Sequence, residues 1–313
     1  MRILVTGGAG FIGANLCRRL VTTPGVTQVS VLDDLSTGSK ANLDGLDVDL
    51  IVGSILDAEL MSRLVDGTDS VVHLAARPSV PRSIQDPMAS HLANATGTMT
   101  VLEAARLSGQ PQVIVASSSS VYGANPILPK REDLASRPLS PYAASKLATE
   151  AYALAYGHSF GLPTIAFRFF NVFGPLQSAS HAYAAVVPSF VDAALHGRPL
   201  TVHGDGTQSR DFTFVDSVTA VLERAITSRL SHPEPVNLAF GSRTTLLELI
   251  AEIESVVGGE LTRVHVDPRA GDVAHSQADS TVLRGLFPDL QPVAFAEAVR
   301  LTVDWFRSLM ERV

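Results

Sequence analysis

Cysteine is almost absent from this sequence. The 313 residues include one cysteine, Cys17, so the chain can form no internal disulfide and no thiolate metal site. Its nine histidines show no HxxxH or HxH spacing, the arrangement that places two imidazoles on one face of a helix or strand. The sequence therefore predicts no metal.

Long hydrophobic runs and an excess of positive charge are also missing. No apolar stretch reaches the roughly 18 residues that a membrane-spanning helix needs. The chain has 31 acidic residues against 24 lysines and arginines, a formal net charge of −7, which argues against nucleic acid as a partner. Its first residues enter a predicted strand directly, so we expect no signal peptide, no membrane association and a cytoplasmic location.

Strand and helix patterns alternate through the first half of the chain. Apolar periodicity predicts strands at 1–6, 28–33, 47–53, 70–76, 112–117 and 162–169, and helices after residue 11 and at 57–65, 88–108 and 141–159. Beyond residue 176 the alternation weakens, with helices at 184–195, 217–227, 246–257 and 294–310 and strands at 236–240 and 263–266. A chain of 313 residues is longer than a single hydrophobic core usually supports. We expect an α/β fold with a first domain at 1–175 and a smaller α/β lobe at 176–313, the strand at 236–240 being a candidate to return to the first domain.

The first strand breaks at spaced glycines and re-forms as a helix that opens with Phe11 and Ile12. Backbone N–H groups then converge at a helix N-terminus, where the dipole favours an anion. Gly7 would make the tight turn, Gly10 would let the backbone approach a pyrophosphate, and Gly13 would let helix and strand pack closely. This pattern predicts a dinucleotide cradle on a Rossmann-type, doubly wound parallel sheet.

A carboxylate follows at the distance that such a cradle requires. The second strand ends in Asp33, about 20 residues after the glycines. A carboxylate there accepts hydrogen bonds from the adenosine ribose and repels a 2′-phosphate, which favours NAD over NADP. We expect the rest of the cofactor site to include Asp34, Ser36, Thr37 and Gly38 near the ribose, Ser54 and Ile55 near the adenine, and Leu74, Ala75 and Ala76 at the end of the fourth strand.

Two further patterns carry chemistry. Four serines at 117–120 end the fifth strand, where open α/β sheets bind ligands. Tyr142 and Lys146 begin the next helix, and their spacing of four residues puts them on one helical face. A lysine ammonium one turn away, together with the positive nicotinamide ring of a bound NAD, favours the phenolate, so we expect a lowered pKa at Tyr142 and a role as a general base.

Taken in order, these residues resemble the extended short-chain dehydrogenase/reductase superfamily, and within it the nucleotide-sugar 4-epimerases. The family's signatures appear as TGGAGFIG at 6–13, HLAA at 73–76, SSSSVYG at 117–123, YAASK at 142–146, RFFNVFGP at 168–175, GDGTQSRDFTFVDSV at 204–218 and RAGDVAHSQAD at 269–279. The resemblance covers nearly the whole chain. It implies NAD as cofactor, a UDP-sugar as substrate and a homodimer formed by the helices that contain Leu102 and Tyr142.

The resemblance also implies roles for individual residues. Ser118, Tyr142 and Lys146 match the catalytic positions, and Asn94 and Phe170 join the cofactor contacts. The implied substrate contacts, besides Ser118 and Tyr142, are Ser79, Ser119, Ser120, Asn171, Val187, Arg210, Arg269, Asp272 and Ser276. One departure is Ser54, where many relatives carry Asp against the adenine, and this weakens one expected contact.

The implied reaction is redox-neutral. Tyr142 would take the proton of the sugar 4-hydroxyl while C4 gives a hydride to NAD, and the 4-keto sugar would turn and take the hydride back on its other face. The main alternative is a lyase on the same scaffold, a 4,6-dehydratase or a uronate decarboxylase, but those relatives carry an acid just after the catalytic Ser/Thr, where this chain has Ser119 and Ser120. A UDP-glucuronate 4-epimerase and a catalytically silent NAD sensor are further alternatives. Asn171, where uronate epimerases often carry Thr, argues against the first, and the base Tyr142 against the second.

Two features bear on the sugar. Ser276 aligns with the family's gatekeeper position, where a large tyrosine restricts the pocket to plain hexoses, and a small serine leaves room for an N-acetyl group. The segment 79–87 also resembles the loop found in epimerases of N-acetylhexosamines. We therefore expect interconversion of UDP-GlcNAc and UDP-GalNAc alongside UDP-Glc and UDP-Gal.

Overall fold

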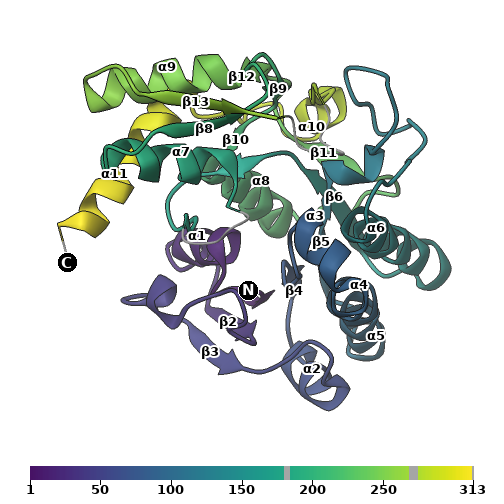
Figure 1. Ribbon diagram of the computed structural model, residues 1–313. Coiled ribbons are helices and arrows are strands. Elements are labelled where there is room, and N and C mark those ends of the chain that lie inside the picture. Colours follow the sequence, from purple (N-terminus) through teal and green to yellow (C-terminus); the bar gives the residue numbers. More distant parts are fainter. Residues whose placement is uncertain (180–183, 268–273, 312–313) are drawn as a thin grey trace.

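A sheet of seven parallel strands forms the centre of the protein. The computed structural model describes residues 1–179, 184–267 and 274–311, and within these the strand order is β11-β6-β5-β4-β1-β2-β3 (Figure 1). The chain winds outward from β1 in both directions, so the predicted doubly wound fold is confirmed. The strands are β1 (Arg2–Thr6), β2 (Gln28–Asp33), β3 (Asp49–Val52), β4 (Ser70–His73), β5 (Gln112–Ser118), β6 (Thr164–Phe169) and β11 (Val236–Leu238).

Helices cover both faces of this sheet. One face packs against α1 (Phe11–Leu20), α8 (Val215–Thr227) and α10 (Thr281–Leu286). The other packs against α2 (Ala58–Val65), α5 (Gly97–Leu107) and α6 (Pro141–Phe160). The central strands β4 and β5 are buried along their whole length, as expected for parallel strands covered on both sides.

A smaller lobe has its own core. It contains α7 (Val186–Leu195), α9 (Leu246–Val257) and α11 (Phe295–Met310), whose apolar faces meet around Phe190, Ile250 and Val303. Three short strand pairs complete it: β7 (Val172–Phe173) with β10 (Thr213–Phe214), β8 (Leu200–His203) with β13 (Arg263–Val266), and β9 (Ser209–Arg210) with β12 (Thr244–Thr245). This lobe lies beside the sheet in Figure 1.

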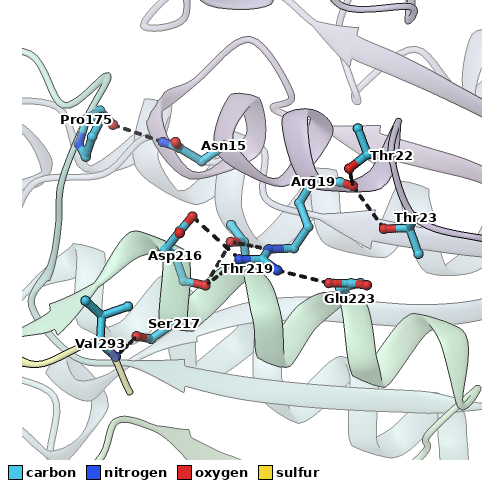
Figure 2. A network of polar contacts seen from close by, with 10 residues as sticks. All are labelled: Asn15, Arg19, Thr22, Thr23, Pro175, Asp216, Ser217, Thr219, Glu223 and Val293. Atoms are coloured by element: carbon cyan, nitrogen blue, oxygen red, sulfur yellow. Dashed lines mark hydrogen bonds and ion pairs between the residues drawn. The ribbon is translucent and has the colours of Figure 1, made fainter. Parts of the chain in front are cut away.

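The two lobes are interleaved along the chain. Strand β11 pairs with β6 in the large sheet, and α8 packs against α1. Arg19 of α1 donates from Nε to Thr219 Oγ1 at 3.0 Å and pairs with Glu223 at 3.2 Å, both on α8 (Figure 2). Residues 215–238 therefore return to the large sheet before the chain ends in the smaller lobe.

The predicted helix at 88–108 is not continuous. A short helix α3 (Val80–Gln85) comes first, and a π-helical turn, η2 (Leu92–Thr96), joins α4 (Pro87–His91) to α5. Asn94 in this turn accepts a hydrogen bond from the Arg77 N–H at 2.7 Å and donates to Ser145 Oγ at 2.9 Å. A π turn adds one residue per turn. Here it contains Asn94, whose side-chain amide lies between the segment after β4 and helix α6. Strand β4 also ends at His73 rather than at 76.

The contact between α1 and the turn after β1 leads to a prediction for stability. A Cβ on Gly13 would lie 2.2 Å from the Gly7 carbonyl oxygen and 2.6 Å from Gly8 Cα. Both are backbone atoms that cannot move aside unless α1 is displaced. We expect Gly13→Ala to lower the free energy of unfolding by about 3 kcal/mol, measured by urea denaturation. Gly285→Ala in α10 is the control, since no other part of the chain lies within 4 Å of that Cβ, and an equal loss in both variants would contradict the argument.

A buried histidine gives a second prediction. His73 is 2% exposed and lies between Thr6 Oγ1 at 2.7 Å and Thr98 Oγ1 at 3.0 Å. Burial, and then the charge of Lys146, lowers the pKa of His73 to about 3. The imidazole has a pKa of 6.5 in the unfolded chain. Between pH 6.5 and about pH 3, only the unfolded chain therefore binds the proton, and the free energy of unfolding falls as the pH falls, by at most about 1.4 kcal/mol per pH unit. We expect His73→Asn to flatten this slope in unfolding measured from pH 6.5 downward, whereas the exposed His91→Asn should keep it.

Candidate active site

A large cavity runs along the carboxyl ends of the sheet strands. Its volume is about 1380 Å³, and its wall follows the residues after β1, β2, β4, β5 and β6 and continues over α7 and α11. The neighbours β1 and β4 mark the point where the strand order reverses. Ligands of doubly wound sheets bind at this point.

The glycine turn after β1 forms one end of this cavity. Gly7 has φ +73°, and a Cβ there would lie 2.6 Å from the Ala75 backbone nitrogen. Side chains at these glycines would fill the cradle, so the residues present fit a dinucleotide whose pyrophosphate approaches bare backbone. Most of the expected cofactor contacts line the cavity: Gly7, Gly10, Phe11, Ile12, Asp33, Asp34, Ser36, Thr37, Ser54, Ile55, Leu74, Ala75, Ala76, Tyr142 and Lys146.

Asp33 has a structural role besides the expected one. Its Oδ2 accepts a hydrogen bond from the Ala9 N–H at 2.9 Å, and its Oδ1 accepts one from the Leu35 N–H at 2.8 Å. Burial raises the pKa of Asp33, and these two bonds oppose that rise. Because each carboxylate oxygen accepts more than one hydrogen bond, Asp33 can fix the glycine loop and still bind a ribose hydroxyl.

The three expected catalytic residues meet at the middle of the cavity. Ser118 ends β5, and Tyr142 and Lys146 lie in the first turns of α6, a helix capped by the Ser140 side chain. The Ser118 hydroxyl lies close enough to the Tyr142 phenol to lower its pKa, and Lys146 Nζ donates to the Ala116 carbonyl at 2.8 Å. The structure thus brings together a hydroxyl, a phenol and an amine that the sequence separates.

The net effect of the protein's own groups is to raise the pKa of Tyr142. Burial raises that pKa, and the Ser118 hydroxyl offsets the rise only in part. Burial also lowers the pKa of Lys146 to about 8. We expected Lys146 and the positive nicotinamide ring together to lower this pKa, and without the ring the pKa is raised, because removal from water acts against the charges of both side chains. Ionisation of Tyr142 needs a further positive charge at this site.

A second cavity adjoins the first. It has a volume of about 240 Å³, and Asn171 lies in the wall of both cavities. Val187 and Arg210, two expected substrate contacts, line the second cavity. Asn171 holds a strained backbone with φ +31° and donates from Nδ2 to the Asp211 carbonyl at 3.2 Å. A ligand that reaches from Tyr142 to Arg210 would pass Asn171.

Several expected contacts lie elsewhere. Asn94 and Phe170 are buried behind the cavity wall, and Gly38 packs against Ala9, where a Cβ would lie 2.8 Å from its carbonyl carbon. Ser276 is 9% exposed, and its N–H donates to the Ser209 carbonyl at 3.0 Å, so it lines neither cavity. Arg269 and Asp272 lie outside the described residues.

Three other expected substrate contacts line the large cavity, and two arginines that the sequence analysis did not name lie there with them. Ser79, Ser119 and Ser120 line the large cavity together with Arg77 and Arg82. Both arginines follow the carboxyl end of β4, which is the signal that could have identified them. Helix α11 also contributes Trp305 and Leu309 to the wall, but its apolar periodicity indicates only that one face is buried.

Known proteins match this arrangement over its full length. The chain is 38% identical to the UDP-glucose 4-epimerase of Mycolicibacterium smegmatis, covering 98% of this chain and 99% of that protein. A UDP-N-acetylglucosamine 4-epimerase structure from Methanobrevibacter ruminantium superposes with TM-score 0.93 at 35% identity, covering 99% of each chain. The UDP-glucose 4-epimerase of Thermotoga maritima gives 0.91 at 33% identity, covering 99% of this chain and 100% of that one. Residues 3–239 also match the model of the NAD dependent epimerase/dehydratase family, and the chain belongs to that family.

Proposed function

We propose that this protein is an NAD-dependent 4-epimerase of UDP-sugars. The observation that carries the proposal is one cavity in which Ser118, Tyr142 and Lys146 face the glycine cradle, continued at Asn171 into the cavity of Arg210. We assign the cofactor to the lobe of residues 1–175 and the nucleotide sugar mainly to residues 176–313. The similar enzymes named UDP-glucose and UDP-N-acetylglucosamine 4-epimerases support this assignment.

Each residue has a role that follows from its place. Tyr142 takes the proton from the sugar 4-hydroxyl, and Ser118 bridges that hydroxyl and the phenol. NAD, when bound, supplies the hydride acceptor for C4 and a positive ring that favours the phenolate. Lys146, whose ammonium group is oriented by its hydrogen bond to the Ala116 carbonyl, holds the nicotinamide ribose. Asn171 and Arg210 hold the diphosphate while the sugar presents its other face.

A lyase reaction has less support. Removal of water from C5 and C6 needs an acid and a base in addition to the epimerase residues. Among the described lining residues of the large cavity the carboxylates are Asp33, Asp34 and Asp192, and none of them follows Ser118. The hydroxyls of Ser119 and Ser120 stand at the position where such an acid would be needed.

The choice of sugar and the assembly are further proposals. We propose that N-acetylated and plain hexoses are both substrates, because the segment 79–87, whose Ser79 lines the large cavity, resembles the loop of N-acetylhexosamine epimerases. We also propose a homodimer formed through α5 and α6: Leu102 is buried within the subunit, but Met99, Leu107 and Phe160 of these helices are 37%, 67% and 47% exposed. Among the described helices none is long and apolar enough to cross a membrane, and the cytoplasmic location remains a proposal for cell fractionation to test.

A direct assay tests the proposed reaction. The purified protein is incubated with UDP-GlcNAc, UDP-GalNAc, UDP-Glc or UDP-GlcA, and the products are resolved by NMR. We expect the 4-epimer of the first three sugars with no net NADH, because the hydride returns to the same carbon. A 4-keto-6-deoxy sugar or release of CO₂ would instead show a lyase.

Two substitutions test the assigned roles. Tyr142→Phe removes the proton acceptor and should lower kcat by about 10³-fold, and Ser118→Ala should lower it by about 10²-fold, within the range that proton transfer contributes to catalysis. The matched control is Tyr152→Phe, an exposed tyrosine on the same helix, which should keep full activity. NAD binding, followed by fluorescence, should persist in all three variants. Retention of most of the activity in Tyr142→Phe would exclude Tyr142 as the base.

A further inference from the structure

Helix α6 is attached to β5 by polar contacts at successive residues. Lys146 and Glu150 follow Tyr142 at intervals of four residues and therefore share its helical face. Lys146 donates to the Ala116 carbonyl at 2.8 Å, and Glu150 accepts a hydrogen bond from Ser117 Oγ at 2.8 Å. The hydroxyl of the next residue, Ser118, lies close enough to Tyr142 to lower the pKa of the phenol. Three consecutive residues of β5 thus contact three residues on one face of α6.

The charge of Glu150 is balanced by Arg168 of β6. The guanidinium donates from Nε to one carboxylate oxygen at 2.9 Å and from Nη2 to the other at 2.7 Å. Both side chains are 4% exposed, so this bidentate pair is almost fully removed from water. It connects α6, the end of β5 and β6 behind the wall of the large cavity.

Arg168 also fixes the far side of the serine segment. Its guanidinium lies over the Tyr122 ring at 4.7 Å from the centroid. Tyr122 ends η3 (Ser119–Tyr122), the turn that directly follows Ser118, and its hydroxyl donates to Asn237 Oδ1 at 2.6 Å. The segment 118–120 is therefore held before its start through Ser117 and Glu150 and after its end through Tyr122 and Arg168.

Stability alone does not explain such a pair. Burying two charges costs so much solvation that apolar side chains of similar volume often give an equally stable fold. Directional hydrogen bonds, in contrast, fix relative positions that apolar packing leaves adjustable. We propose that Glu150 and Arg168 are positioning residues that hold Ser118 against Tyr142, and that they act on catalysis without touching the ligands. The effect on turnover rests on the proposed epimerase function.

The test replaces the whole pair, because removing one partner would leave a buried charge. The double variant Glu150→Leu/Arg168→Met should unfold at the urea concentration of the wild type and bind NAD and UDP equally well. Its KM should be unchanged and its kcat should fall by about 10²-fold, the loss expected when reacting groups shift by about an ångström. Ser117→Ala removes only the bond to Glu150 and should lower kcat by about tenfold, again at constant KM.

A second readout needs no turnover. The nearby Ser118 hydroxyl lowers the pKa of Tyr142, so moving Ser118 away should raise that pKa. The phenol is titrated by ultraviolet absorbance as the difference between each protein and the same protein carrying Tyr142→Phe. We expect an upward shift of the Tyr142 titration in the double variant and in Ser117→Ala. If the wild type lacked epimerase activity, the proposed function would fail, and this titration would still judge the positioning role.

The matched control is the pair of Arg19 and Glu223 between α1 and α8 (Figure 2). Arg19→Met/Glu223→Leu also replaces an ion pair between two elements, but these elements carry no catalytic residue, so kcat and the Tyr142 titration should stay unchanged. The proposal is overturned if the double variant at 150 and 168 keeps the wild-type kcat and Tyr142 titration. It is equally overturned if stability and kcat fall together while the titration does not move, because the pair is then structural only.

Discussion

The close contact between helix α1 and the turn after β1 determines where the cavity lies. The missing side chain of Gly13 lets the start of the helix rest on the turn after β1, and that of Gly7 lets the turn approach the Ala75 backbone after β4. A Cβ on Gly8 would lie 2.7 Å from Val31 Cγ1 of β2. A cradle made of backbone cannot adjust by side-chain rotation. The groups from β4, β5 and α6 must therefore be built to match it.

The parts of the fold that local sequence defines could be predicted. A strand, a glycine turn and a helix follow one another within about 20 residues, so the cradle, Asp33 and the succession of the first six strands along the chain could be predicted from periodicity and spacing. The return of β11 to the large sheet was raised as a possibility for the strand at 236–240, but the return of α8 was not predicted. The apolar stripe of α8 would fit either lobe, and only contacts such as Arg19 with Glu223 decide between them.

The candidate site divides in the same way. Ser118 and Tyr142 could be predicted because they stand at the end of a strand and the start of a helix, where side chains face ligands. Asn94 and Phe170 were expected as ligand contacts, but both are buried behind the cavity wall. A sequence gives the position of a residue along an element, and the π turn at Asn94 changes which way its side chain points. Periodicity does not register such a change, since the apolar pattern continues through the turn.

Burial at this site has two opposed effects. It makes hydrogen bonds between α6 and β5 directional and strong, because water does not compete for them. The same burial raises the pKa of Tyr142 and lowers the pKa of Lys146 to about 8, so the protein alone disfavours the charged forms of its own catalytic pair. In the proposed reaction, the positive ring of bound NAD would supply the charge that favours the phenolate. We infer that the fold positions Tyr142 beside Ser118 and Lys146, and that NAD bound in the glycine cradle would favour the ionised phenol.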